Sequence, residues 1–591
     1  MNGTHSSTLA PRRWLDGLFW SLLGICTTLL VLPMWIGVTP PLSDFTGHAA
    51  MADIWVNYDT VPHYSEHFVK AGWWVPNILP MHFCKLLYPW LSVITSLRLW
   101  LTLSLLLTVV SLLELARAFE RSPWLVFPAL PFLWNSSLYL GFVNYVPIVP
   151  LVFFSLTLTR QARRTDRFAP LHWLLLSLGM MAYFIHGIGW CIVVMASGSM
   201  GLLSLNFRQL TRVALAWSPS ALVWLVWYGT RKSNVEGQAG AIPGLDGAAI
   251  ATSTIEYPPA LQRMNLFFEH GLNIVTSSAD TNVFVALIAM IAVILTTYAQ
   301  GNVETLASTR PLTLTGASWP ARFWARLERD LLEHPLVLIW LLWGACIYLL
   351  PVSLNSVMLS TRFVPFFFLI FPFLVKGRRI APLAGTALAS SIVICIIFGG
   401  LLVNWSLRFN QREIKPMLAA LKQVPEGAQF DCFGVDWIPA TFSHWPLMHT
   451  CRGLGHTQRQ IKGHGGFARD SFNAVMFSET YRPPTIDYHR FTNGIEVQAL
   501  DYVIVRNGVT PPEGLAEHVE SFRGNKLGGA VYSLLRIKRY PEFLPGIGFV
   551  CDGHNQSVPS VGALCPDPFD TLRVPPSTED QSAVDPKNSA R

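Results

Sequence analysis

The sequence predicts a polytopic α-helical membrane protein that ends in a small exported α/β domain. Two observations predict this class: the high hydropathy and the uneven spread of charge. Only 13% of the 591 residues are charged, 51% are hydrophobic and the mean hydropathy is +0.38, whereas soluble domains carry about a quarter charged residues. Residues 405–591 hold 38 charged side chains, and the much longer 1–404 hold 41. We therefore expect a membrane domain over 1–404, an exported domain over 405–572 and a disordered tail over 573–591.

This composition excludes an ordinary soluble enzyme, a disordered chain and a fibrous protein. The C-terminal part carries 19 positive and 19 negative residues, so the net charge of +7 belongs to the membrane part. Membrane topology explains this excess better than nucleic acid does, and no nucleic-acid partner is expected.

The hydrophobic runs predict about eleven spans, because a helix crosses the hydrocarbon core with roughly 17–25 apolar residues. Pro128 and Pro131 are expected to kink the third run and Pro147 the fourth. The runs lie at 17–37, 98–117, 123–140, 145–160, 170–187, 189–206, 213–230, 281–299, 335–353, 362–376 and 381–403.

The basic residues set the direction of these spans. Residues 72–95 are apolar but contain His82, Lys85 and three prolines, so we interpret them as interfacial or re-entrant. With the N-terminus inside, the basic clusters near 117–121, 160–167, 208–212, 310–329 and 376–379 all fall on the cytoplasmic side. The loops 38–97 and 231–280 and the C-terminal domain are then outside the cytoplasm.

Four cysteines of the exported domain are candidates for disulfides, because an oxidising compartment permits them. They allow three pairings, of which 432–451 and 551–565 are local, and four free thiols are the alternative. The four residues are Cys432, Cys451, Cys551 and Cys565. Their spacing does not match a structural zinc site, and no metal ligands are predicted.

Polar chemistry is concentrated in the first outer loop. Asp44 follows the first span by a few residues, so it is expected near the outer membrane surface. Asp44 and His48 are spaced i, i+4 and share one helix face. A catalyst that acts on a lipid-linked substrate needs a carboxylate at this level. The alternative is that Ser43 or Asp44 only caps the helix that begins there.

Several segments resemble the GT-C superfamily of integral-membrane glycosyltransferases. The segment PLSDFTGHAA resembles the short Asp-containing motif after the first span of bacterial members. LGFVNYVPIVPL, AYFIHGIGW and STRFVPFFFLI are similar to segments of such proteins, and YVIVRNG followed by GGAVYSLLRI looks like their small terminal domain. The resemblance implies a GT-C-like fold and a polyprenyl-phosphate-linked sugar as donor.

The resemblance also implies roles for individual residues. Asp44 would be the general base of an inverting transfer. His48 would pair with Asp44 and tune it, or would simply be exposed. Arg362, at the outer end of the tenth run, would bind the donor phosphate, because guanidinium suits bidentate contact with phosphate; the alternative is an interfacial Arg that reaches ordinary lipid headgroups. His186 would orient the phosphate or the acceptor, or be structural. Arg231 and Lys232 are further phosphate-binding candidates.

The exported domain is expected to hold a mixed sheet, with strands near 428–434, 501–506 and 529–537 after a helix over 405–424. The glycine-rich stretch 453–470, with His456 and His464, is a candidate contact for an acceptor or a phosphate.

Three functions follow from these features. The first is a hexosyl- or pentosyltransferase at the outer face of a bacterial inner membrane, with a cell-envelope glycan, a lipid or a protein as acceptor and membrane lipids as partners. No cofactor is assigned, and the sequence is compatible with transfer that either needs a divalent metal or does not. The second is a transporter or flippase of lipid-linked glycans, although the spans hold few of the acidic or basic residues that ion-coupled transporters use. The third is a noncatalytic assembly protein for envelope polysaccharides.

Overall fold

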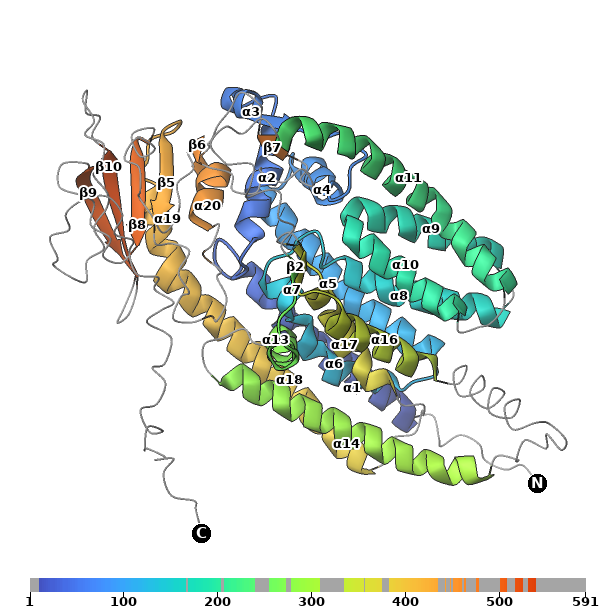
Figure 1. The fold of residues 1–591 in the computed structure, drawn as a ribbon. Coiled ribbons are helices and arrows are strands. Elements are labelled where there is room, and N and C mark those ends of the chain that lie inside the picture. Colours follow the sequence, from blue (N-terminus) through green and yellow to red (C-terminus); the bar gives the residue numbers. More distant parts are fainter. Residues whose placement is uncertain are drawn as a thin grey trace, which may run out of the picture.

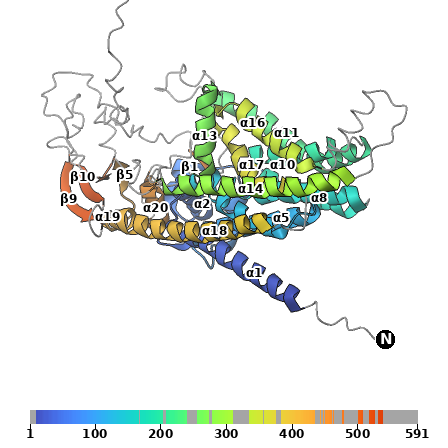
Figure 2. The same ribbon diagram turned by 90° about the horizontal axis from the view of Figure 1, so that it is seen from below.

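The computed structural model is mostly helical, with a small sheet near the C-terminus. Figure 1 shows the helices as one body and the sheet at one end of it, and Figure 2 shows the same arrangement from below. The structure describes residues 10–165, 168–202, 207–239, 255–272, 278–308, 334–354, 357–374, 382–433, 442, 447, 450–459, 462–463, 475–477, 500–506, 516–524 and 530–537.

Within these residues, five helices are long and apolar enough to cross a membrane. Their apolar stretches are Leu15–Trp35, Val93–Ala118, Leu210–Thr230, Ala279–Thr297 and Pro382–Leu421. The helices that carry them are α1 (Ala10–Val31, continued by η1, Leu32–Trp35), α5 (Val93–Ala118), α11 (Phe207–Ala239), α14 (Ala279–Ser308) and α18 (Pro382–Phe409).

The other six predicted runs form shorter apolar helices of 10–17 residues. Each of the eleven runs thus contains helical segments within the described residues, but only five of the runs carry a helix long enough to be a span. The shorter helices are α8 (Ile148–Thr165), α9 (Phe168–Ile185), α10 (Gly187–Leu202), α16 (Pro335–Leu349), the segment η2–α6–η3 (Pro123–Leu125, Val126–Ala129 and Leu130–Leu133) and the segment η4–α17–η5 (Ser360–Phe363, Val364–Ile370 and Phe371–Leu374).

The third run was predicted to be one helix kinked at Pro128 and Pro131. The structure does not show such a helix. The run is broken into short 3-10 and α segments, and a separate turn of helix, α7 (Ser136–Tyr139), follows after Asn135. Pro128 and Pro131 lie inside this run, and each removes a backbone N–H donor that a continuous α-helix would use.

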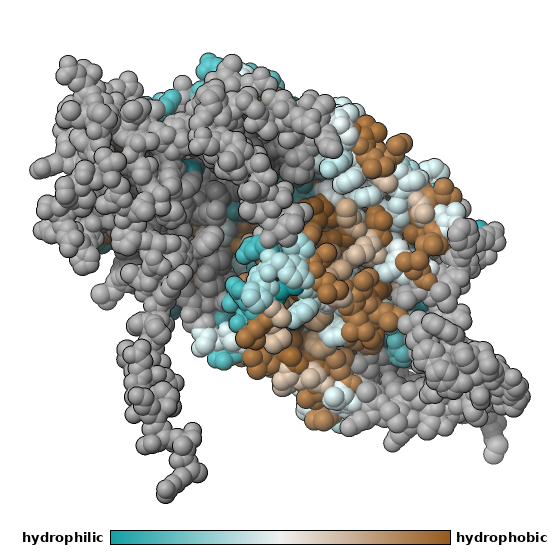
Figure 3. All heavy atoms as spheres, viewed as in Figure 1, coloured by the Kyte–Doolittle hydropathy of each residue, from teal (hydrophilic) through white to brown (hydrophobic). Residues whose placement is uncertain are grey.

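The outside of the helical body is apolar. Large hydrophobic side chains are exposed along α5, α11, α16 and α18, and Figure 3 shows hydrophobic residues over much of the helical face in that view. Soluble monomers rarely expose contiguous apolar patches of this kind, so the surface fits a lipid environment. Examples are Leu103, Leu107, Leu222, Leu225, Leu349, Val393 and Ile397.

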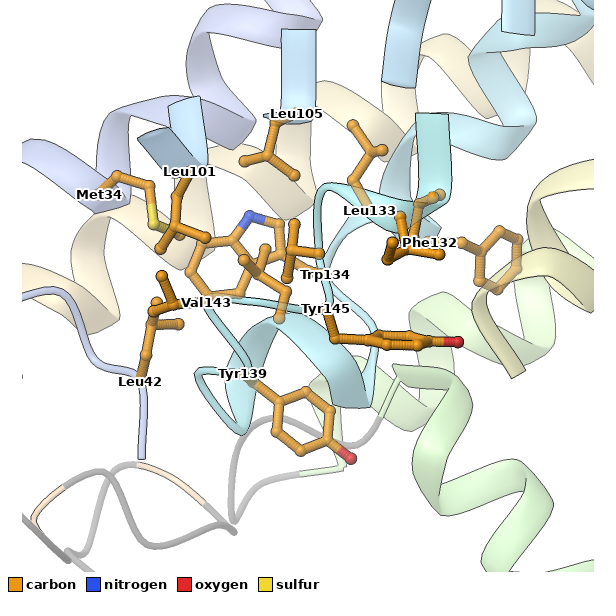
Figure 4. Packing of buried hydrophobic residues seen from close by; sticks show 14 of the residues in the cluster. Met34, Leu42, Leu101, Leu105, Phe132, Leu133, Trp134, Tyr139, Val143 and Tyr145 are labelled. Carbon is orange, nitrogen blue, oxygen red and sulfur yellow. The ribbon is translucent and has the colours of Figure 1, made fainter. Parts of the chain in front are cut away.

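The interior is packed around aromatic side chains. Trp134 is fully buried, and its indole Nε1 donates a hydrogen bond to the carbonyl of Leu30 at 2.8 Å. Figure 4 shows its ring among Met34, Leu101 and Val143. The nearby Tyr139 and Tyr145 direct their hydroxyls away from this apolar cluster, and these hydroxyls donate hydrogen bonds to the carbonyls of Glu269 at 3.2 Å and of Arg362 at 2.5 Å.

The segment 38–97, which the sequence predicts to be the first outer loop and which keeps that name below, is largely folded. It contains α2 (Phe45–Asn57), α3 (Pro62–His67), β1 (Phe68–Lys70) and α4 (Leu79–Leu87). The region 72–95 forms only the short helix α4 and turns before α5 begins. Helix α4 packs against α2 and α5, while Trp73 and Trp90 are exposed.

The second outer loop is described in part. Helix α13 (Ala260–Leu272) packs against α14, α16 and α17. A small antiparallel sheet joins β2 (Ile255–Glu256) to β3 (Ser353–Leu354) and β3 to β4 (Val357–Met358), and this sheet leads directly into η4.

One long helix connects the body to the C-terminal sheet. Helix α18 continues through a π-helical turn, η6 (Asn410–Ile414), into α19 (Lys415–Leu421). The boundary expected between 404 and 405 therefore lies inside a helix that does not break there.

The C-terminal sheet is mixed, as predicted. Its order is β6 (Lys462–Gly463), β5 (Gln429–Phe433), β8 (Tyr502–Arg506), β10 (Val531–Ile537) and β9 (Ala516–Arg523). Strand β5 runs parallel to β6 and β8, and β10 runs antiparallel to β8 and β9. The three predicted strands are confirmed, and β6 and β9 are additional.

A buried ion pair joins the π-helical turn to this sheet. Arg506 donates two hydrogen bonds to the carboxylate of Glu413, at 2.7 and 3.1 Å, and the hydroxyl of Tyr532 donates a third at 3.0 Å. Both partners of the ion pair are less than 10% exposed. The carboxylate of Glu413 in η6 thus accepts hydrogen bonds from side chains of both β8 and β10.

Replacing Glu413 by Ala is expected to destabilise the sheet strongly. Removing one partner of a buried pair leaves an uncompensated charge and typically costs about 3–5 kcal/mol. The measurement is hydrogen exchange of β8 and β10 in the full-length protein. Asp59→Ala is the control, since Asp59 pairs with Lys70 at 3.2 Å but is 77% exposed, and such pairs contribute about 0–1 kcal/mol. Equal protection of β8 and β10 in the two variants would contradict the assignment.

Candidate functional site

The segment between α7 and α8 holds the start of the first outer loop. The Asn135 side chain accepts a hydrogen bond from Ser137 N at 3.0 Å and so caps α7. The chain then turns at Gly141, where φ is +78°, a value that favours glycine. A Cβ at Gly141 would lie 2.7 Å from the backbone nitrogen of Asp44. The two segments therefore touch at their backbones.

Two backbone hydrogen bonds set the position of Asp44. Ser43 N donates to the carbonyl of Tyr139 at 3.1 Å, and Asp44 N donates to the carbonyl of Leu140 at 2.9 Å. Asp44 stands at the N-cap position of α2, but its side chain makes no capping hydrogen bond. The capping alternative raised by the sequence is therefore not what its carboxylate does.

The surroundings of Asp44 favour the protonated carboxyl group. The side chain keeps part of its surface accessible, yet the protein around it raises the pKa to about 7 by removing water, an effect that the charge of Arg362 partly offsets. A carboxyl group with a pKa near neutral pH can both take up and release a proton.

His48 lies one helical turn after Asp44. Its backbone nitrogen donates to the carbonyl of Asp44 at 3.0 Å, which continues the first turn of α2. The imidazole is buried, and burial, assisted by the charge of Arg362, lowers its pKa to about 4. At neutral pH this ring is therefore uncharged and adds no second cation beside Asp44.

Arg362 is held between two aromatic rings. Its guanidinium carbon lies 4.0 Å from the ring centroid of Phe142 and 4.6 Å from that of Tyr145. Its Nε donates to the carbonyl of Met358 at 3.2 Å, and the hydroxyl of Tyr145 donates to the carbonyl of Arg362 at 2.5 Å. The residue is 8% exposed.

One nitrogen of this guanidinium is an unused donor. Within the part of the chain that the structure describes, Nη1 of Arg362 is buried and has no hydrogen-bond partner. Leaving a buried donor unsatisfied costs free energy, and more so when the group is charged. The site therefore favours an anionic ligand that would accept from this nitrogen.

His186 lies between α9 and α10, on the far side of Tyr145. Its Nδ1 accepts a hydrogen bond from Gly189 N at 3.0 Å, so the neutral ring carries its proton on Nε2. The ring packs edge to face on Tyr145, with centroids 5.3 Å apart, and the charge of Arg362 acts on it. His186 thus has a structural role at the start of α10 and also belongs to the cluster around Tyr145.

The structure brings together four of the six predicted site residues: Asp44, His48, His186 and Arg362. Arg231 and Lys232 lie in the last part of α11, and their side chains are outside the described residues.

Sequence reasoning missed Phe142 and Tyr145, the aromatic rings that hold Arg362. The available signal was a break between two apolar runs, where Gly141, Asn144 and Pro147 follow one another closely. This pattern marks a non-helical segment inside the membrane part, and such backbone occurs where it is buried in protein or lines a cavity.

The remaining predicted residues fall outside this cluster. A disulfide joins Cys432 to Cys451, one of the local pairings left open by the sequence, while Cys551 and Cys565 lie outside the described residues. His456 is 1% exposed and packs near Tyr64. His464 and the tail 573–591 also lie outside the described residues. Among the described residues, no group of three or more Asp, Glu, His or Cys side chains is arranged to hold a metal ion.

The sequence was compared with protein-family models and with curated proteins. No family model matches the chain, and no curated protein matches it.

Proposed function

We propose that the protein is an inverting glycosyltransferase that takes a sugar from a polyprenyl-phosphate donor at the outer face of a bacterial inner membrane. One observation carries the proposal. An acid with a pKa near 7, Asp44, lies within the field of Arg362, a buried arginine whose Nη1 has no hydrogen-bond partner among the described residues. A general base and a cation for a leaving phosphate are the two groups that such a transfer needs.

The reaction is a single displacement. The hydroxyl oxygen of an acceptor attacks the anomeric carbon from the side opposite the phosphate, and the new C–O bond inverts that carbon. The bond between the anomeric carbon and the phosphate oxygen breaks, and its electron pair stays on the phosphate. The acceptor proton moves to the carboxylate of Asp44. The products are the glycoside and the free polyprenyl phosphate.

Arg362 stabilises the charge that develops on the leaving phosphate. The aromatic rings on either side hold its guanidinium in place, so little reorganisation is needed when the charge appears. His186 can donate from Nε2 to the same phosphate. His48, being neutral, adds no second positive charge beside Asp44.

The proposal includes a membrane arrangement. All eleven apolar helical segments would lie in the membrane, with the N-terminus cytoplasmic and the loops 38–97 and 231–280 and the domain 405–572 outside. The basic clusters between the runs support this direction. The short helices support it too, since helices in the interior of a bundle can be broken where neighbouring helices satisfy their backbone.

The test is a transfer assay with the purified protein in lipid nanodiscs. The donors are radiolabelled polyprenyl-phosphate hexoses and pentoses. The assay is run with and without EDTA to test whether transfer depends on a divalent metal. Cleavage of a donor with release of polyprenyl phosphate supports a transferase. A protein that moves these lipids across vesicle membranes without cleaving any of them would be a flippase, and one that does neither would be an assembly protein.

The rate of transfer is expected to rise with pH through about pH 7. Asp44 acts as a base only when ionised, and its pKa is raised to about 7. Below that value the ionised fraction of the free enzyme, and with it kcat/KM, falls about tenfold per pH unit. The measurement is kcat/KM for the donor between pH 5 and 8. A rate that is independent of pH over this range would contradict Asp44 as the base.

A further inference from the structure

A helix of the C-terminal domain lies directly on the helix that follows Asp44. Helix α20 (Thr450–Arg459) packs along α2, and the hydroxyls of Thr46 and Thr450 are 3.5 Å apart. A Cβ at Gly453 would lie 2.3 Å from the carbonyl oxygen of Thr46. The two helices therefore touch at their backbones, which only glycine permits at this position. Figure 1 shows α20 between α2 and the sheet.

Two glycines of the glycine-rich stretch 453–470 thus allow close packing of a helix. Gly455, two residues later, faces the ring of Phe430 on β5, where an added Cβ would meet the ring at 2.1 Å. One side of α20 contacts the first outer loop, and another side contacts the C-terminal sheet.

Two strong links fasten α20 to the sheet. The disulfide joins Cys451 of the helix to Cys432 of β5, with Cα atoms 6.3 Å apart. The next residue, Arg452, donates two hydrogen bonds to the carboxylate of Asp431, at 2.6 and 2.9 Å, and Asp431 is fully buried. The start of α20 therefore cannot move without the strand.

The same domain also holds the first outer loop at two other points. Strand β1 pairs antiparallel with β7 (Val475–Phe477), which lies far along the chain. On the other side of Asp44, the Asn410 side chain accepts from Val38 N at 3.4 Å, and a Cβ at Gly37 would overlap this side chain. The loop is thus fixed before Asp44 by Asn410, near the end of the last long apolar helix, and after Asp44 by β7 of the C-terminal domain.

We propose that the C-terminal domain is a positioning element for the candidate site, in which α20 holds the first turn of α2 and the disulfide between Cys432 and Cys451 holds α20. This inference rests on the proposed function. Gly453 and the two cysteines are positioning residues, since they act through α2. The site is then complete only when the domain has folded and oxidised outside the cytoplasm.

The first test compares two identical substitutions in the full-length protein in nanodiscs. Gly453→Ala adds a methyl group where it meets Thr46, and Gly400→Ala adds the same group in α18, where none of the described residues lies within 4 Å. An alanine normally stabilises a helix relative to glycine, so steric contact is the only cost that differs. We expect the amides of α2 to exchange hydrogen at least about tenfold faster in Gly453→Ala and at the wild-type rate in Gly400→Ala.

The second test removes the tether without a clash. The double variant Cys432→Ser/Cys451→Ser is expected to raise the exchange of both α20 and α2, while α5 keeps its protection. If Gly453→Ala fails to fold, the double cysteine variant alone tests whether α20 holds α2. Wild-type exchange of α2 in the double variant would overturn the proposal, as would equal exchange of α2 in the two glycine variants.

A third measurement connects the docking to the chemistry. The charge of Arg362 acts on Asp44, and it also acts on His48 and His186, whose ring packs on Tyr145. When the first turn of α2 opens to water, the pKa of Asp44 moves down from about 7 toward its ordinary value. In Gly453→Ala the acid limb of the pH profile is therefore expected to shift to lower pH, and kcat to fall more than the KM for the donor changes.

The outcomes separate this proposal from the proposed function. If the wild-type protein transfers no sugar, the exchange of α2 still reports whether α20 holds it. If transfer is normal but α2 exchanges alike in all variants, the transferase stands and the positioning role is wrong.

Discussion

Replacing Asp44 by Asn is expected to lower the rate of sugar transfer by about 10²–10⁴-fold, the range that a general base contributes. The amide has nearly the shape of the carboxyl group but cannot accept the acceptor's proton. The backbone bonds of Ser43 and Asp44 to the segment before Gly141 do not involve the side chain, so the fold of the loop is expected to persist. The measurement is kcat with the donor that the wild-type protein uses.

Asp53→Asn is the matched control for this variant. Asp53 is the next acid of α2, is 5% exposed and also has a raised pKa, about 6, because of burial. It accepts hydrogen bonds from Tyr64 at 2.7 Å and Asn57 at 3.0 Å, which gives it a structural role. We expect Asp53→Asn to cost about 1–3 kcal/mol of stability and to leave kcat and its pH profile unchanged. Wild-type kcat in folded Asp44→Asn protein would remove Asp44 from the mechanism.

Replacing Arg362 by Gln is expected to lower kcat by about 10²–10³-fold, as the loss of one well-placed electrostatic donor does. The cation also lowers the pKa of Asp44, so its removal is expected to move the acid limb of the pH profile above pH 7. A merely destabilised protein would not show this shift. Arg362→Lys keeps the charge but loses the planar contact with Phe142 and Tyr145, and we expect an intermediate kcat.

Arg263→Gln is the control for removing a buried arginine. Arg263 is 6% exposed, lies 3.9 Å from the ring centroid of Tyr257 and donates to the carbonyl of Leu350 at 2.6 Å. It resembles Arg362 in burial and in its aromatic contact, but it packs on different rings. A loss of stability with an unchanged pH profile is expected for this variant. If Arg362→Gln behaves in the same way, Arg362 only supports the fold.

The apolar runs were the most predictable part of the fold. In a lipid environment, a long hydrophobic stretch such as 93–118 satisfies its backbone hydrogen bonds within one segment by forming a helix. Predictions were less accurate where contacts with distant segments of the chain determine the secondary structure. Strand β9 is an exposed, charged edge strand without apolar alternation, and it pairs only because β10 offers an edge. Helix α20 contains two glycines, and their contacts with Thr46 and Phe430 explain them.

The sequence identified the residues of the candidate site separately, but it did not predict which of them lie together. The spacing of Asp44 and His48 puts both on one helix turn, which local geometry alone decides. Arg362 and His186 were expected at the outer ends of apolar runs, but nothing in their local sequence says that they meet. Their meeting depends on Tyr145, which contacts Arg362 across 217 positions of the chain. Contacts at such separations leave no periodic signal in the sequence.

The sequence by itself determined the class of protein, the helical nature of its apolar runs, the strands of its terminal sheet and the residue types available for chemistry. Hydropathy and local periodicity decide these features, since they depend on each segment and its solvent. Only the tertiary structure decided that Phe142 and Tyr145 hold Arg362 in the cluster with Asp44, and that α20 covers α2. These contacts join segments that are distant in the chain, and close packing of specific shapes, rather than the average character of any segment, selects them.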